Sequence, residues 1–311
     1  MKRFKNILYF ADGPVRGAHA FDRAVALART NQARLTVLDV IPEARVEWGL
    51  KERYGVRVTE SIREQRLDEL AVLTAPHTDA GTAVSTDVII GTPFIEVIRA
   101  VDRNGYDLLV KTARPPAGLT ANIFGSADTH LLRKCPCPVW IDRPGSAHPY
   151  RTLLAAVDPM DPRQDEFNRL VMDLATSLAA REQATLHVVH AWRLYGEAAL
   201  RDGRGRIPRS ELEDLLAATE QDHREALDRL ARPYGLTAAG RNVHLIKGEA
   251  AAVIAKEASD KGADLIVMGT VGRTGVPGLF IGNTAEDVLK ATRTAVLAVK
   301  PPGFISPVKL T

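Results

Sequence analysis

The chain has 311 residues, of which 45% are hydrophobic and 25% are charged, proportions that are typical of globular proteins. Its 41 basic and 38 acidic residues give a net charge of +3 without a long Lys/Arg block, which argues against a nucleic-acid-binding protein. No apolar run reaches the length of a membrane span, and no signal peptide is recognisable, so we expect a cytoplasmic protein. The length favours two domains over a single core.

The first predicted element, residues 4–12, is a buried strand that ends in Asp12, and it has a counterpart 146 residues later. The counterpart, residues 150–158, is also apolar and ends in Asp158. Residues 32–37 match residues 183–188 at an offset of 151, and from Gly91 onward the two halves align without a gap at an offset of 157. The chain is therefore a duplication, with one domain over 1–146, a second over 147–311 and a short linker at 142–149.

Within each copy, short Val/Ile/Leu-rich runs alternate with helical patterns. Thr92 and Pro93 are typical of a helix N-cap and first turn, and residues 211–232 carry apolar side chains at helical spacing. This alternation predicts an α/β fold, an open parallel sheet with helices on both faces, and a ligand at its topological switch point. In the second copy the predicted strands are 152–157, 184–191, 242–246, 265–268 and 295–299.

A glycine-rich segment follows the fourth strand of the second copy. Such a run allows main-chain N–H groups to approach a phosphate, and Arg273 can add a positive charge. Asn283 is predicted as the N-cap of the next helix, with Glu286 in the capping-box position, so that the helix N-terminus faces an anion. A β–α turn that binds nothing is the alternative. The glycines are Gly269, Gly272, Gly275, Gly278 and Gly282.

The spacing Gly-x2-Gly-x9-Gly in this segment resembles the ATP-binding signature of the universal stress protein family. The sequences Gly-Thr-Val-Gly-Arg-Thr-Gly and Gly-Asn-Thr-Ala-Glu resemble the tandem, E-type members in particular, and the similarity covers essentially the whole chain. One departure is that Asn283 stands between Gly282 and Thr284, whereas the family has Ser or Thr directly after the last glycine.

The resemblance implies a fold and a ligand. The fold is two Rossmann-like (HUP, adenine nucleotide α-hydrolase-like) domains, each a five-stranded parallel sheet of order 3-2-1-4-5. The ligand is ATP, or AMP or ADP, with Mg²⁺ as a possible companion of the phosphates. Asp158 is assigned to the base and ribose, and the backbone of Ala191 to the adenine; a loop-capping role for Asp158 is the alternative. The implied nucleotide-binding residues are Asp158, Ala191, Met268, Gly269, Gly272, Arg273, Gly282, Asn283 and Thr284.

The first copy departs from this pattern. It keeps Asp12 and Gly125, but Thr112 and Pro115 stand where the second copy has Gly269 and Gly272. Proline has no N–H to donate, so we expect no ATP binding of the family type in this copy. We expect Lys111 and Arg114 either to attract an anion or to be solvated surface charges.

No catalytic residue is predicted, because the motifs of the related enzymes are missing. The first strand is not followed by Gly-x-Gly-x-x-Gly, and no P-loop is present. No Ser–His–Asp set or metal cluster is evident; His187 and His190 are expected to pack or to border the site, and Cys135 and Cys137 to be reduced thiols. Three interpretations remain open: a nucleotide-binding regulator with an unknown protein partner, an enzyme such as a slow ATPase, and a scaffold that binds another phosphate-bearing molecule.

The fifth strand of each copy, 139–141 and 296–299, is apolar and is expected at a sheet edge. A bare edge strand promotes strand pairing. Domains of this family commonly dimerise through this edge, so the resemblance implies an intramolecular pseudo-dimer of the two copies. A homodimer through other faces remains compatible with the sequence.

Overall fold

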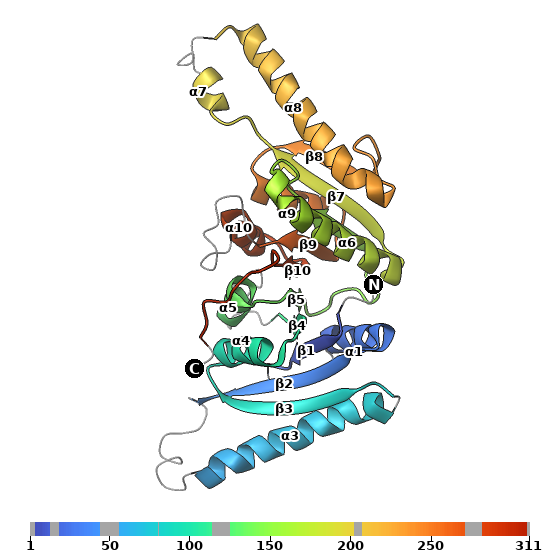
Figure 1. The fold of residues 1–311 in the computed structure, drawn as a ribbon, viewed down its shortest axis with the longest axis vertical. Helices are drawn as coiled ribbons and strands as arrows, with labels where there is room; N and C mark the ends of the chain where they lie inside the picture. The colour runs from blue at the N-terminus through green and yellow to red at the C-terminus, as the bar shows by residue number, and fades with distance from the viewer. Residues whose placement is uncertain are drawn as a thin grey trace. The chain divides into compact units, whose positions relative to one another are not determined.

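The computed structural model describes residues 4–12, 19–43, 56–79, 81–113, 125–201, 207–270 and 282–309, which form two compact units (Figure 1). The first unit contains the described residues up to His148 together with 295–309. The second contains the described residues from Pro149 to 270 and from Gly282 to Thr294. Strands alternate with helices in both units, so the predicted α/β class is confirmed.

The first unit is built on a sheet in the order β3-β2-β1-β4-β5-β10. The strands of the first copy are parallel to one another and have the predicted order 3-2-1-4-5. β10, the fifth strand of the second copy, adds to β5 in the antiparallel direction, with Leu297 opposite Trp140. The elements are β1 (Asn6–Phe10), α1 (His19–Asn31), β2 (Arg34–Pro42), α3 (Val56–Asp79), β3 (Val84–Gly91), α4 (Pro93–Asn104), β4 (Leu108–Thr112), α5 (Ser126–Lys134), β5 (Val139–Asp142) and β10 (Ala295–Val299).

The second unit contains parallel strands in the order β9-β6-β7-β8. The chain passes from β6 to β7 and β8 on one side and returns to β9 on the other side of β6, which is a topological switch point. Its elements are β6 (Thr152–Ala156), η2 (Pro162–Gln164), α6 (Asp165–Glu182), β7 (Thr185–Trp192), α7 (Glu197–Arg201), α8 (Arg209–Ala231), η3 (Arg232–Tyr234), β8 (Val243–Lys247), α9 (Ala250–Asp260), β9 (Leu265–Gly269) and α10 (Asn283–Ala291).

The strands supply the core of each unit. Residues 7–10 of β1 and 265–268 of β9 are all buried, as expected of parallel strands covered on both faces. In the first unit, α3 packs along β3 and α1 packs on β4. In the second, α6 packs on β6 and β9, and α8 on β7 and β8 (Figure 1).

The duplication is visible in the backbone as well as in the sequence. Gly105 and Gly262, which are 157 residues apart, each lie within two residues of a helix end in the left-handed conformation, with φ of 63° and 59°. Gln32 and Gln183 follow α1 and α6 with φ of 51° and 56°. Thr92 is the predicted N-cap of α4, although its hydroxyl makes no capping hydrogen bond. Local sequence therefore determines where the helices end.

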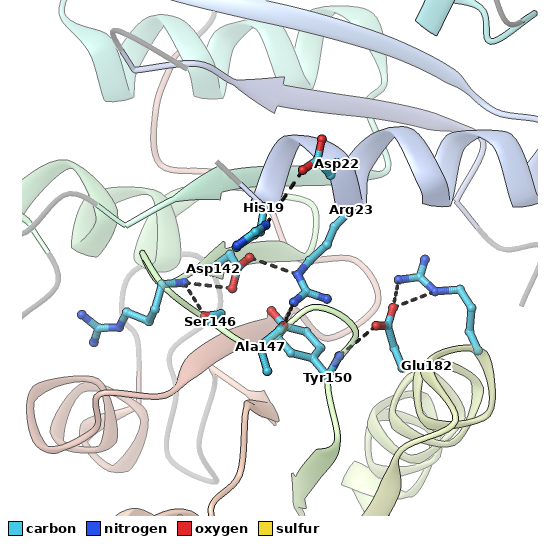
Figure 2. Close-up of polar contacts among 10 residues, drawn as sticks. His19, Asp22, Arg23, Asp142, Ser146, Ala147, Tyr150 and Glu182 are labelled. Atoms are coloured by element: carbon cyan, nitrogen blue, oxygen red, sulfur yellow. Dashed lines mark hydrogen bonds and ion pairs between the residues drawn. The ribbon is translucent and has the colours of Figure 1, made fainter. Parts of the chain in front are cut away.

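A fully buried arginine holds the end of β5 in the first unit (Figure 2). Arg23 of α1 donates from Nε to Asp142 at 3.1 Å and also bonds the carbonyl of Ala147. In the second unit, Glu182 at the end of α6 accepts a hydrogen bond from the N–H of Tyr150 at 3.1 Å (Figure 2). Both ends of the segment between the copies are thus fixed, each within its own unit.

Cys135 and Cys137 are buried free thiols whose Sγ atoms lie 3.5 Å apart. None of the helices in the described ranges is both long and apolar enough to cross a membrane.

Candidate functional site

The second unit has a pocket at the carboxyl ends of β6, β7 and β9, beside the N-terminus of α10. Its empty space, including the open mouth, is about 810 Å³. Ligands of open α/β sheets bind at this edge, at the switch point. Of the residues predicted from sequence, the pocket is lined by Asp158, Ala191, Met268, Gly269, Gly282 and Thr284. Gly272 and Arg273 lie outside the described residues.

Ala191 contributes a strand edge to this pocket. The last residue of β6, Ala156, lies opposite Val189, but β7 continues to Trp192. The Val189 carbonyl accepts from the N–H of Val157 at 3.1 Å. Backbone groups of alternate residues point to the same side of a strand, so Ala191 directs its peptide groups to that side, past the end of β6. A donor and an acceptor on such an edge can pair with the rim of a planar base.

Asp158 lies two residues after the end of β6, and its backbone is held by Asn168 of α6. Oδ1 of Asn168 accepts from the N–H of Asp158 at 3.0 Å, and Nδ2 donates to the Asp158 carbonyl at 2.8 Å. Asn168 is itself buried and lines the pocket. The acidic side chain is therefore presented from a loop whose backbone hydrogen bonds are satisfied by a neighbouring helix.

His190 forms part of the pocket wall and is buried. Its Nδ1 lies 3.1 Å from the Val157 carbonyl, and its Nε2 lies 2.7 Å from Nδ1 of His223 on α8. The expectation that His190 packs or borders the site is consistent with this geometry. His187, on the same strand, bonds His244 instead, at 3.0 Å.

Gly269 has a structural reason to be glycine. A Cβ at this position would lie 2.5 Å from Cε1 and 2.7 Å from Cζ of Phe167, a buried ring of α6 that also lines the pocket. Atoms cannot approach so closely, so a side chain here would push α6 or its ring away. The first glycine of the motif therefore permits the close packing of α6 on β9, whatever the pocket binds.

The N-terminus of α10 borders the pocket, and here one prediction is wrong. Gly282, with φ of −62°, is the N-cap, and Asn283 is the first helical residue. The reason is that the Gly282 carbonyl accepts from the N–H of Glu286 at 3.0 Å, which starts the helix one residue earlier. Glu286 is consequently past the capping-box position and pairs with Lys290 at 3.0 Å. The first N–H groups of α10 have no acceptor within the helix and can receive an anion.

The corresponding place in the first unit is filled by an ion cluster. Lys111, fully buried, donates to Asp12 at 3.0 Å and bonds Asp128, which is also fully buried. Asp128 accepts from the N–H of Gly125 at 3.1 Å, so its carboxylate lies at the N-terminus of α5. The expectation that Lys111 attracts an external anion or is solvated is wrong, because internal carboxylates neutralise it. Arg114 lies outside the described residues.

The two copies differ in bulk at matched positions. At the offset of 146, Ala156 corresponds to Phe10. At the offset of 157, Met268, Gly269 and Ala285 correspond to Lys111, Thr112 and Asp128. Each of these second-copy residues lines the pocket, whereas the ring of Phe10 lies against Lys111, with 5.4 Å from Nζ to its centroid. The same fold thus leaves a cavity in one copy and fills the equivalent place in the other.

Sequence reasoning missed several residues of this site. Asn168, Phe167 and His223 belong to helices whose apolar pattern gave no reason to single them out. Asp128 had a usable signal, because a gap-free alignment of the copies places its charge opposite Ala285. Among the described residues, no group of three His, Cys, Asp or Glu side chains is arranged to hold a metal ion.

Comparisons with known proteins agree with this architecture. The sequence model of the universal stress protein family matches residues 3–143 and again residues 149–300. Universal stress protein E of Escherichia coli (strain K12) is 29% identical over 317 residues, which cover 100% of this chain and 98% of that protein. The universal stress protein E homolog of Haemophilus influenzae is 28% identical over 311 residues, 96% of this chain and 98% of that protein.

A solved structure with the same fold is that of a universal stress protein from Pseudomonas aeruginosa UCBPP-PA14. Its TM-score is 0.74 at 26% sequence identity, and the match covers 96% of this chain and 94% of that one. The family model matches both halves of the sequence, and the full-length relatives are E proteins. The chain belongs to the universal stress protein family, as a tandem member that resembles its E-type proteins.

Proposed function

We propose that the second copy binds an adenine nucleotide and that the protein acts as a nucleotide-dependent regulator rather than as an enzyme. The observation that carries this proposal is the contrast between the copies. Ala156, Gly269 and Ala285 leave space in the second copy, where Phe10, Thr112 and Asp128 occupy it in the first. Among the described residues, Phe10, Lys111 and Asp128 occupy in the first copy the place that is open in the second, and this contrast favours a ligand for the second copy.

The chemistry of the pocket supports a nucleotide. The edge of β7 at Ala191 suits a base, Asp158 suits ribose hydroxyls, and the N-terminus of α10 at Gly282 suits phosphates. These features lie along a pocket whose remaining described walls are largely apolar, as binding sites for small molecules usually are. The full set of proposed binding residues is Asp158, Ala191, Met268, Gly269, Gly272, Arg273, Gly282, Asn283 and Thr284.

Titration calorimetry with ATP tests the proposal. We expect one site per chain with micromolar affinity, about −8 kcal/mol. Ala285→Asp introduces the first copy's carboxylate at the N-terminus of α10 and is expected to abolish binding. Ala252→Asp, the same substitution on the exposed face of α9, is the matched control and should bind normally. Two equivalent sites, no binding, or normal binding by Ala285→Asp would contradict the proposal.

The same titrations separate the alternatives. Repeating them with AMP, ADP, and ATP with and without Mg²⁺ identifies the preferred form and any contribution of the cation. Binding of other phosphate compounds but not of adenine nucleotides would favour the scaffold interpretation. Steady release of phosphate from ATP, lost in Ala285→Asp, would favour an ATPase.

We also propose that the two copies form an intramolecular pseudo-dimer through their fifth strands. The antiparallel pairing of β10 with β5, with Ala298 opposite Val139, supports this arrangement. Cysteines placed at these two positions, with Cys135 and Cys137 changed to Ser, should form a disulfide within one chain. A disulfide between two chains would instead indicate a homodimer that exchanges strands.

A further inference from the structure

One peptide group of the second unit is held from both sides. The peptide between Val157 and Asp158 has its N–H bonded to Oδ1 of Asn168 at 3.0 Å and its carbonyl bonded to Nδ1 of His190 at 3.1 Å. Asn168 and His190 come from different elements, α6 and β7, and both are buried. Asn168 also donates to the Asp158 carbonyl at 2.8 Å and to that of Gln164 at 3.1 Å. The orientation of this peptide is consequently set by packed secondary structure rather than by the loop itself.

The hydrogen bond to the Val157 carbonyl also determines which ring nitrogen of His190 carries the proton. A carbonyl oxygen only accepts, so Nδ1 of His190 must carry the proton. In the neutral ring, Nε2 is then an acceptor, and it receives the hydrogen bond from Nδ1 of His223 at 2.7 Å. The two rings stack with centroids 5.0 Å apart, and His223 also lies against Trp192 at 5.9 Å. α8 therefore supports the histidine that holds the peptide before Asp158.

The first copy lacks the histidine of this pair. At the offset of 151, His190 corresponds to Asp39. Asp39 bonds the N–H of Val40 at 2.8 Å and Nε of Arg66 at 2.6 Å. The carboxylate of Asp39 cannot donate a hydrogen bond as the ring of His190 does.

The backbone of the two motif aspartates differs accordingly. Asp12 has φ of 41°, in the left-handed region that is unfavourable for residues with a Cβ, and its carboxylate contacts Lys111. Among the described residues, the non-glycine positions with positive φ are Asp12, Gln32 and Gln183. The two glutamines are repeat partners, but Asp158, the partner of Asp12, is not in this group. The duplication is therefore broken at Asp158, which lines the pocket of the second copy.

We propose that Asn168 and His190 are positioning residues that fix the peptide preceding Asp158, so that its carboxylate is presented to the ribose hydroxyls of the nucleotide, and that His223 holds His190 in the required tautomer. This inference rests on the proposed nucleotide site. Its physical basis is preorganisation: an acceptor that is already oriented loses little conformational freedom on binding. We call the two hydrogen bonds that Asn168 and His190 make to this peptide the clamp, and its His190 half has no counterpart in the copy closed by Lys111.

The experiment compares the affinities of ATP and 2′,3′-dideoxy-ATP. For the wild type we expect ATP to bind roughly 10- to 100-fold more tightly, because hydrogen bonds from the ribose to a charged group are at stake. Asn168→Leu and His190→Leu should reduce this ratio to about 3-fold or less. His187→Leu, on the same strand and outside the pocket lining, is the matched control and should keep the ratio. A merely structural role would weaken both nucleotides equally, and an unchanged ratio in both variants would overturn the inference.

A second measurement needs no nucleotide. The N–H of Asp158 should be protected from hydrogen exchange in the wild type and exchange faster in Asn168→Leu, and ¹⁵N spectra should show His190 protonated at Nδ1 only. An unprotected Asp158 amide, or a proton on Nε2 alone, would overturn the clamp even if ATP binds. Should Asn168→Leu fail to fold, Asn168→Asp removes the donor and should lower the ratio in the same direction. If the wild type binds neither nucleotide, the proposed function fails, while the exchange data still decide whether the peptide is clamped.

Discussion

Gly269 and Phe167 are in such close contact that residue 269 has no room for a side chain: an added Cβ would lie 2.5 Å from Cε1 of the ring. We expect Gly269→Ala to destabilise the second unit by about 1–3 kcal/mol, the usual cost of overpacking a core. Nucleotide binding should weaken too, because Phe167 lines the pocket. Denaturant unfolding and titration calorimetry measure the two effects.

Replacing the ring of Phe167 with a smaller side chain is the control for that prediction. The double variant Gly269→Ala/Phe167→Leu should recover part of the lost stability, because the new methyl group then has space. If Gly269→Ala unfolds at the same denaturant concentration as the wild type, the contact does not explain the glycine.

Lys111 lies between two carboxylates in the first unit, so its removal leaves charge buried without compensation. Lys111→Met, which introduces the second copy's residue, should destabilise the protein by about 3–5 kcal/mol. Adding Asp128→Ala should recover much of this loss, because Asp128 is then no longer an unpaired buried charge. Arg193→Met breaks an ion pair whose partners are 64% and 56% exposed, and it should cost less than ~1 kcal/mol. Equal losses from Lys111→Met and Arg193→Met would show that the cluster is not important for stability.

The histidine pair on β7 and β8 predicts a dependence of stability on acidic pH. Burial lowers the pKa of both His187 and His244 from the usual 6.5, with Lys261 acting in the same direction and Glu257 opposing it. The unfolded chain therefore binds these protons more readily, and stability should fall as the pH drops below 6.5. Urea unfolding between pH 7.5 and 5 should show a shallower decline for His187→Leu/His244→Leu than for the wild type. If the free energy of unfolding falls equally with pH in the two proteins, this dependence does not come from the histidine pair.

Lys300 predicts an effect at alkaline pH. Its Nζ donates to the carbonyls of Leu132 and Arg133 at 2.6 and 3.2 Å, and burial lowers its pKa to about 8 from 10.5. Between these values the unfolded chain holds a proton that the folded chain has lost, so the contribution of Lys300 to stability rises with pH. The stability of the wild type relative to Lys300→Met should increase by ~3 kcal/mol from pH 8 to 10.5, at 1.36 kcal/mol per pKa unit. The comparison with Lys300→Met removes the effects of pH on stability that the two proteins share.

Much of the fold was predictable because it depends on short-range pattern. The apolar runs at 152–157 and 295–299 match β6 and β10 to within a residue, and Thr92 with Pro93 marks the start of α4. The constant offset of 157 after Gly91 revealed the duplication. The N-cap of α10 was predicted one residue too late, because the residue type favoured Asn283 over Gly282. The hydrogen bond from Glu286 to the Gly282 carbonyl decides between them.

By itself, then, the sequence determined the duplication, the α/β class and the position of the glycine-rich motif, because residue spacing along a strand or helix encodes each of them. The sequence also favoured the second copy for ligand binding, but only the tertiary structure showed which side chains fill the corresponding place in the first copy. Lys111 meets Asp12 across 99 residues, and His190 meets His223 across 33, so no local pattern records either contact. The cost of burying a charge or a polar group makes such partners necessary, but their identity depends on which side chains the completed fold brings within hydrogen-bonding distance.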